Sequence, residues 1–428
     1  MMRRLLLTLL CLPLVGALAD TATDNASPED GPAEPEEEVI AEEDDDTQEI
    51  DTETTVDYTE AKTGFKNDGD LRLIYDYFDI TGRNGETLQD EVAGFRFRTR
   101  VDYGITEPLH VGARLAGSCF TDDLCDLEFV MEDAAPQSNG LKGGQFTFDE
   151  LYLHWFRTDR ASFAVGRLQT RFVMRSGVYA KSLDRNNSNN VNVNWTDGFQ
   201  ATYRARNGWN SSYVLERNSR DGASSIRHGE LDFDDNKARN TSFFGFENIN
   251  RWGPIVQRAL DISYLPSSLL KDGTADGRRE DYWGIVGRLV GRWPQRREGI
   301  RLRAGIEAAY APETATREAV DIDSSVNGLA WDIVISLMDF LPTHSIGLNY
   351  AQTGAGWLLS PQFRPNEELI EIRYIWNPGK PYWPLLEARI RRREDLEQLI
   401  GASQKREEFD GYLRLTWDFT FKGRLGLR

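Results

Sequence analysis

The stretch Phe95-Arg96-Phe97-Arg98-Thr99-Arg100-Val101-Asp102-Tyr103 decides the fold class. Charged side chains hold every second position, and most of the positions between them are apolar or aromatic. Successive side chains of a β-strand point to opposite faces, so this pattern predicts a strand with one charged and one apolar face. The same alternation recurs in residues 300–310 and 413–421. A soluble β-sandwich and a transmembrane barrel are both built from such strands, and the alternation alone does not separate them.

Sixteen segments of this character follow one another along the chain. After residue 63, no stretch approaches the roughly 20 apolar residues that a membrane-spanning helix needs. An all-β fold is therefore predicted. The expected strands are residues 70–79, 92–104, 109–117, 146–157, 161–168, 197–206, 209–216, 240–249, 258–265, 281–292, 300–310, 328–338, 344–354, 367–376, 383–392 and 410–421.

The links between these segments alternate in length, and this alternation separates the two classes. Short links run through residues 105–108, 158–160, 207–208, 252–254, 294–298, 341–343 and 377–379. Long polar loops run through residues 118–145, 169–196, 217–239, 266–280, 311–327, 355–366 and 393–409. Short turns at one end and long loops at the other are typical of a transmembrane barrel, and a soluble sandwich has no reason to keep that asymmetry. We therefore expect residues 63–428 to form a 16-stranded antiparallel transmembrane β-barrel, with short periplasmic turns and long external loops.

The membrane also dictates the shape and the surface of such a barrel. An unpaired backbone group in hydrocarbon costs several kcal/mol, so the sheet must close on itself within the lipid of the outer membrane. Sixteen strands close into a cylinder too wide for side chains to fill, which leaves an aqueous channel. Aromatic residues near strand ends fit the two girdles at the membrane surfaces, namely Tyr103, Trp155, Trp209, Trp293, Trp376, Trp383 and Trp417.

The N-terminus predicts export. Arg3 and Arg4 precede a short apolar run, and Ala17-Leu18-Ala19 supplies the small residues of a signal-peptidase site before Asp20. The run is short for a membrane anchor and contains Pro13. Residues 1–19 are therefore expected to be a signal peptide, and the mature chain is expected in the bacterial outer membrane.

Residues 20–62 differ sharply in charge from the rest of the chain. They contain 18 Asp or Glu residues and one Lys, a net charge of −17 out of −19 for the whole sequence. Such a composition cannot bury enough apolar surface to offset its ordering entropy, so a disordered acidic periplasmic tether is expected. Two interpretations stay open: a solvated tether, or a segment that binds cations or a basic periplasmic partner.

The export signal, the sixteen segments and the long third loop after Val165-Gly166-Arg167 resemble Gram-negative porins. The arginine-rich strands are similar to those of the phosphate-selective porin group. The resemblance covers residues 63–428 and implies a homotrimer, a third loop that folds into the lumen, and passive diffusion of small hydrophilic solutes. One feature departs from it: porins usually end on an aromatic residue, whereas this chain continues from Phe421 to Arg428.

The charge that faces the lumen predicts which solutes pass. The candidate pore-lining and anion-binding residues are Arg96, Arg98, Arg100, Arg301 and Arg303 on the strands, and Arg171, Arg175, Lys181 and Arg185 in the third loop. Guanidinium groups stay charged and bind carboxylate or phosphate in a bidentate manner, so we expect a preference for anions such as phosphate. The alternative is that these arginines pair with lumen acids such as Asp102, Glu307, Glu371 and Glu387, and only solvate the wall.

The sequence gives no sign of catalysis. The histidines His110, His154, His228 and His344 are scattered without metal-ligand spacing, and no nucleophile motif is present. Asp68-Gly69-Asp70 is interpreted as a turn before the first strand. We expect no enzymatic activity, no cofactor, no metal site and no nucleic-acid partner. The alternative function is a structural outer-membrane anchor whose acidic segment binds periplasmic partners.

Two cysteines remain after removal of the expected signal peptide. Cys119 and Cys125 both lie in the second long loop and are separated by five residues. An exported chain folds in an oxidising compartment, so a disulfide between them is predicted.

Overall fold

The computed structural model describes residues 64–121, 125, 128–130, 144–168, 173–184, 196–218, 239–271, 279–294, 299–360, 364–380 and 382–423. The expected signal peptide, the acidic segment 20–62 and the third-loop residues Arg171 and Arg185 lie outside these ranges. The boundaries of these N-terminal segments therefore stay predictions.

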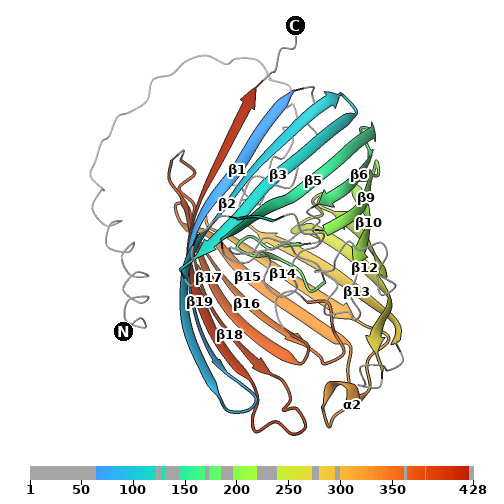
Figure 1. Cartoon of the computed structure of the whole chain (residues 1–428), viewed down its shortest axis with the longest axis vertical. Helices are drawn as coiled ribbons and strands as arrows, with labels where there is room; N and C mark the ends of the chain where they lie inside the picture. The colour runs from blue at the N-terminus through green and yellow to red at the C-terminus, as the bar shows by residue number, and fades with distance from the viewer. Residues whose placement is uncertain are drawn as a thin grey trace, which may run out of the picture. The chain divides into compact units, whose positions relative to one another are not determined.

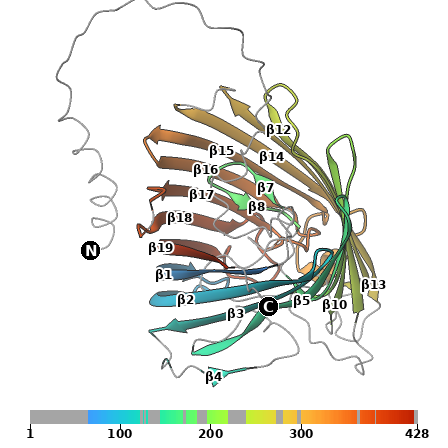
Figure 2. The same cartoon turned by 90° about the horizontal axis from the view of Figure 1, so that it is seen from above.

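Sixteen strands of the described chain form one closed antiparallel barrel (Figures 1 and 2). The ring closes because β1 pairs with β19 as well as with β2. Three further short strands, β4 (Glu128–Phe129), β7 (Met174–Arg175) and β8 (Ala180–Lys181), and one short helix, α2 (Arg317–Val320), belong to the loops. The barrel strands are β1 (Phe65–Thr81), β2 (Thr87–Thr106), β3 (Leu109–Phe120), β5 (Gln145–Thr158), β6 (Ala161–Leu168), β9 (Thr196–Arg204), β10 (Trp209–Asn218), β11 (Arg239–Asn248), β12 (Ile255–Leu270), β13 (Arg279–Trp293), β14 (Arg301–Tyr310), β15 (Leu329–Leu341), β16 (His344–Thr353), β17 (Glu367–Trp376), β18 (Leu385–Asp395) and β19 (Glu407–Gly423).

The two ends of the barrel differ as the link lengths predicted. Only two residues connect β2 to β3, β5 to β6 and β15 to β16, and these turns share one end with the start of β1 and the end of β19. We call this the turn end; in Figure 1 it is the upper end, and α2 marks the opposite, loop end. Among the described residues, no helix is both long enough and apolar enough to cross a membrane.

Burial alternates along the strands with a period of two. In β14, Arg301, Arg303 and Glu307 are buried, whereas Leu302 and Ile306 on the other face are exposed. Exposed leucine, isoleucine and aromatic side chains therefore cover the outside of the barrel, and charged side chains lie inside. This is the reverse of a soluble protein and the distribution that a barrel in lipid requires.

The expected strands are all present, but β1 begins earlier than the sequence suggested. Asp68-Gly69-Asp70 is part of β1 and not a turn before it, so that interpretation was wrong. The aspartates face the lumen, and Gly69 lies opposite Phe419, where a Cβ atom would come within 2.5 Å of the phenyl ring. A glycine covered by a cross-strand aromatic ring is compatible with a continuous strand.

The predicted aromatic girdle also needs a correction. The seven expected residues lie at or towards the turn end of their strands, and therefore contribute to one girdle, not two. At the loop end other aromatic pairs take this place, including Tyr264 with Trp283 (ring centroids 4.4 Å apart) and Trp331 with Tyr350 (5.1 Å). Period-two alternation assigns a face but does not say at which membrane surface a residue lies.

The outward apolar face leads to a first prediction. Ile335 lies near the middle of β15 and is 47% exposed, so Ile335→Arg places a charge in hydrocarbon. We expect a loss of about 2–4 kcal/mol in unfolding free energy in lipid vesicles, measured by urea titration. Leu329→Arg, at the loop end of the same strand, is the control and should cost about 1 kcal/mol or less. Equal effects of the two substitutions would contradict the assigned membrane face.

Candidate functional site

The inner wall along β1, β2, β3 and β5 is a layer of paired charges. Arg96, Arg98 and Arg100 lie on the inner face of β2 and are at most 3% exposed. Arg96 Nη2 lies 2.7 Å from Asp70 Oδ1, and Arg100 donates two hydrogen bonds to Asp68, at 2.9 and 2.8 Å. Arg98 lies 3.2 Å from Asp149. The structure thus brings the three predicted arginines together, each with a buried carboxylate beside it.

Two arginines of this layer were missed by the sequence analysis. Arg72 in β1 lies directly opposite Arg96, and its Nε donates to the Thr416 hydroxyl at 3.2 Å. Arg114 in β3 binds Asp149 through two hydrogen bonds and lies 2.8 Å from Glu150. Arg72 lies inside the expected strand 70–79, so alternation along that strand would have identified it as an inward-facing residue.

The layer continues across β17, β18 and β19. Arg373 contacts Glu371 at 2.6 Å and Glu387 at 3.2 Å, and Glu387 also pairs with Arg414. The guanidinium of Arg373 lies 4.8 Å from the ring centroid of Tyr179, a residue of the third loop. Glu371 and Glu387, named above as possible counter-charges, therefore do pair with wall arginines.

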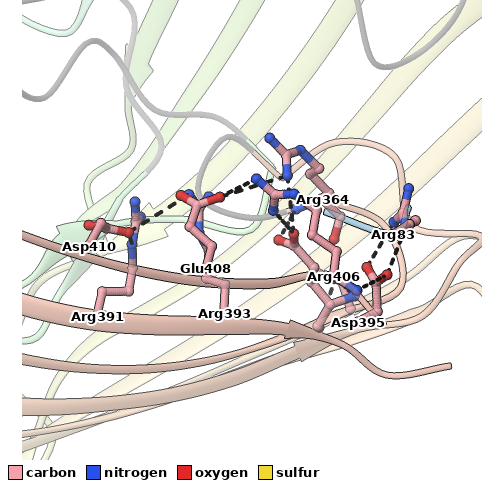
Figure 3. A network of polar contacts seen from close by, with 10 residues as sticks. Arg83, Arg364, Arg391, Arg393, Asp395, Arg406, Glu408 and Asp410 are labelled. Carbon is pink, nitrogen blue, oxygen red and sulfur yellow. Dashed lines mark hydrogen bonds and ion pairs between the residues drawn. The ribbon is translucent and has the colours of Figure 1, made fainter. Parts of the chain in front are cut away.

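At the loop end the layer widens into a group that we call the mouth cluster (Figure 3). Its residues come from four parts of the chain: the β1–β2 turn, the β16–β17 loop with the start of β17, the C-terminal part of β18, and the β18–β19 loop with the start of β19. Arg83 makes a bidentate contact with Asp395 (2.7 and 2.8 Å), and Arg406 lies 3.2 Å from Glu367. The members are Arg83, Arg364, Arg391, Arg393 and Arg406 with the acids Glu367, Asp395, Glu408 and Asp410.

The mouth cluster has more positive than negative charge. Its five arginines face four carboxylates, and Arg364 is 51% exposed with its nearest acids at 3.6 and 3.8 Å. Burial, with the neighbouring charge of Arg364, lowers the pKa of Arg406 from its ordinary value. Hydrogen bonds to Asp395 instead raise the pKa of Arg83. The positive charge is therefore least compensated at Arg364, because Arg406 has the carboxylates of Glu367 and Glu408 beside it.

The described part of the third loop, residues 173–184, folds against the inner wall of β12 to β17, and Figure 2 shows β7 and β8 inside the ring of strands. The Tyr179 hydroxyl donates to the carbonyl oxygens of Gly347 and Glu371, at 3.2 and 3.1 Å. A Cβ atom at Gly347 would come within 2.6 Å of the Tyr179 ring, so glycine is needed for this close approach.

The residues predicted in this loop have different environments. Arg175 Nε donates to Glu247 Oε1 at 3.1 Å, and the Arg175 side chain is 30% exposed. Lys181 belongs to β8, but its side chain lies outside the described atoms. Of the predicted third-loop residues, Arg175 is thus one whose side chain is described and is partly exposed to solvent.

A second charged group fixes the C-terminal part of this loop. Glu307 accepts hydrogen bonds from the Leu183 backbone N–H and the Ser182 hydroxyl, both at 2.8 Å, and pairs with Arg288. Arg288 also lies 2.7 Å from Asp184. From the loop between β16 and β17, Trp357 Nε1 donates to the Leu183 carbonyl at 3.0 Å. These contacts hold the loop on the wall of the lumen.

The other two predicted wall arginines, Arg301 and Arg303, are buried on the inner face of β14. Arg301 pairs with Asp339 at the turn end of β15. Glu307 is used by Arg288 and by the third loop. The sequence analysis named Glu307 as a possible counter-charge for wall arginines, and the structure pairs it with Arg288 of the neighbouring strand β13.

The structure joins Cys119, at the loop end of β3, to Cys125 in a disulfide with a Cα–Cα distance of 5.5 Å. His110 and His154 lie on the inner face of the wall, and His344 lies among aromatic residues at the turn end. Within the described ranges, no group of three or more His, Cys, Asp or Glu side chains is arranged to hold a metal ion.

Neither a protein-family model nor a curated protein matches this sequence. Solved structures do. Pseudomonas putida OprB has a TM-score of 0.51 at 10% identity, with 83% of this chain and 94% of that chain covered. Pseudomonas aeruginosa OccK8 (OprE) has a TM-score of 0.50 at 12% identity, with 84% and 100% covered. The outer membrane protein OprD of P. aeruginosa has a TM-score of 0.49 at 11% identity, with 85% and 96% covered.

At this identity the likeness shows the fold alone. The closed barrel of sixteen described strands, its apolar outer face and this likeness together give the fold of a transmembrane barrel of the Gram-negative outer membrane. They give no support to a special resemblance to phosphate-selective porins.

The contacts around Glu307 lead to a second prediction. Glu307→Ala removes the acceptor of the Leu183 N–H and one partner of Arg288. Buried hydrogen bonds to charged groups are worth about 1.5–3 kcal/mol, so amide exchange in residues 173–184 should accelerate about tenfold or more. Hydrogen–deuterium exchange of the protein in detergent measures this. Asp149→Ala is the control, because Asp149 is equally buried but belongs to the layer along β2, β3 and β5. Unchanged exchange in Glu307→Ala would show that other contacts hold the loop.

Proposed function

We propose that this protein is an outer-membrane porin, a water-filled channel through which small hydrophilic solutes diffuse passively, with a preference for anions. A closed barrel of sixteen strands is wider than its side chains can fill. Its charged residues face inwards and its apolar residues outwards, as a channel wall in lipid requires.

The observation that carries the anion preference is the mouth cluster. A solute that enters from the loop end meets Arg364, which is half exposed and whose nearest acids among the described residues lie 3.6 and 3.8 Å away. Planar guanidinium groups bind carboxylate or phosphate through two parallel hydrogen bonds. Small carboxylates and phosphate therefore share the chemistry that this cluster offers.

The paired wall makes this preference moderate. Below the mouth, Arg96, Arg98 and Arg100 each lie beside a buried carboxylate, which cancels most of their long-range field. Such a wall presents alternating donors and acceptors to a solute and holds no anion tightly. Weak and distributed contacts suit passage, because a solute that binds strongly leaves slowly.

The third loop supports a narrowed channel. Its described part covers the inner wall of β12 to β17, so solutes would pass between this loop and the charged layer along β17 to β5. The homotrimer implied by the resemblance to porins remains a prediction.

Reversal potentials in a KCl gradient across planar bilayers test this proposal. Replacing the least compensated cation, Arg364→Ser, should lower the chloride-to-potassium permeability ratio by about two- to fivefold in 0.1 M salt. A charge in water is worth about 1 kcal/mol at 4 Å, which limits the effect. The difference should fade in 1 M salt, where the Debye length is about 3 Å.

The matched control is Arg317→Ser, which removes an exposed arginine from α2, outside the mouth cluster. This variant should keep the wild-type ratio. Stepwise conductance with no anion preference would leave an unselective pore. Complete absence of conductance steps would contradict the channel and favour the membrane-anchor alternative.

A further inference from the structure

A group of arginines lies at the turn end of neighbouring strands β5, β6, β9, β10, β11 and β12. We call it the basic rim, and its members are Arg157, Arg160, Arg204, Arg206, Arg251 and Arg258. Asp159 is an exposed acidic residue among them. The strands are consecutive in the sheet, so the six positive charges gather on one arc of the barrel.

The basic rim differs from the inner wall in its counter-charges. On the inner wall, Arg96, Arg98, Arg100 and Arg114 each lie beside a buried carboxylate, as described above. Within the part of the chain that the structure describes, Arg157, Arg160, Arg206 and Arg258 form no ion pair, and the side chain of Arg204 donates to the Asn210 amide oxygen at 3.3 Å. Six arginines and one exposed aspartate, Asp159, leave this arc with an excess of positive charge, so it favours an external anion.

Arg258 has the most defined surroundings. Its guanidinium carbon lies 5.8 Å from the ring centroid of Trp209 and 5.7 Å from that of Trp252. Its Nη2 donates to the Asn250 carbonyl at 3.2 Å, and its Nε is buried without a hydrogen-bond partner among the described residues. Two indole rings thus fix the cation at the barrel surface, through contacts that are stronger when water is excluded.

The direction of the side chains indicates which anion. Arg258 shares its strand face with the exposed Leu260, and Arg157 shares its face with Leu153 and Trp155, so both point away from the lumen. Trp252 is 68% exposed beside them. Tryptophan rings settle at the level of lipid headgroups, and arginines next to them reach the phosphate layer.

We propose that the basic rim is a binding site for anionic phospholipid headgroups in the periplasmic leaflet, with the phosphate held at Arg258 and Arg251 between Trp209 and Trp252. The proposal rests on the membrane orientation given under the proposed function, but not on conduction. Lipid phosphates would offset the excess of positive charge that six arginines and Asp159 leave on this arc. The headgroups also fix the depth and the tilt of this side of the barrel.

Native mass spectrometry of the full chain in a non-ionic detergent, titrated with phosphatidylglycerol, tests this inference. The wild type should retain phosphatidylglycerol in preference to phosphatidylcholine of the same chain length, which has no net charge. Arg251→Gln with Arg258→Gln should weaken phosphatidylglycerol binding about tenfold, or about 1.4 kcal/mol. Arg258→Lys keeps the charge and should retain most of the binding.

Arg392→Gln is the matched control, because Arg392 is an outward arginine at the loop end that pairs with Glu394 and Glu407. It should bind phosphatidylglycerol as the wild type does. Equal retention of the two lipids, or an equal loss in the control, would overturn the site. A change in subunit number without a change in lipid binding would instead assign the basic rim to an interface between copies of this chain. Loss of channel conductance with lipid binding intact would contradict the proposed function only.

Discussion

A backbone N–H or C=O group without a partner costs several kcal/mol in hydrocarbon, and most of this structure follows from that constraint. The sheet has no free edge because β1 pairs with β19 over the whole of both strands. Once the ring is closed, period-two alternation sends one face to lipid and the other to the lumen. Most charged side chains of the strands then lie on the inner face, where each buried charge needs a counter-charge.

On the inner wall, arginines of one strand form ion pairs with carboxylates of a neighbouring strand. Arg96 with Asp70 and Arg100 with Asp68 join β2 to β1, while Arg114 with Asp149 joins β3 to β5. Removing one partner of a buried pair leaves an uncompensated charge, which costs far more than the pair contributes. The ion pairs of the wall therefore stabilise one register between neighbouring strands, since a shift in register would separate the paired charges. At the mouth cluster, where Arg364 is half exposed, the five arginines outnumber the four carboxylates.

Much of the fold could be predicted from the sequence, because closure and alternation are local patterns with global consequences. The sixteen strands, the asymmetry of their links and the inward direction of Arg96 and Arg303 follow from parity alone. The partners could not be predicted in this way, since they depend on the stagger between strands. Arg301 pairs with Asp339, thirty-eight positions along the chain, although Glu307 is closer in sequence. The position of Tyr179 on Gly347 depends on the path of a long loop, which no short pattern encodes.

The central claim is that paired charges on the inner wall line the path of the solute. Reversal potentials of a variant with Arg96→Ser and Arg100→Ser test it most directly. Asp68 and Asp70 then lose their main counter-charges, so the permeability ratio should shift strongly towards cations. Adding Asp68→Asn and Asp70→Asn should return the ratio close to that of the wild type, and heat-modifiable folded barrel should be present in both variants. A ratio that stays at the wild-type value in the first variant, with the barrel correctly assembled, would contradict the account.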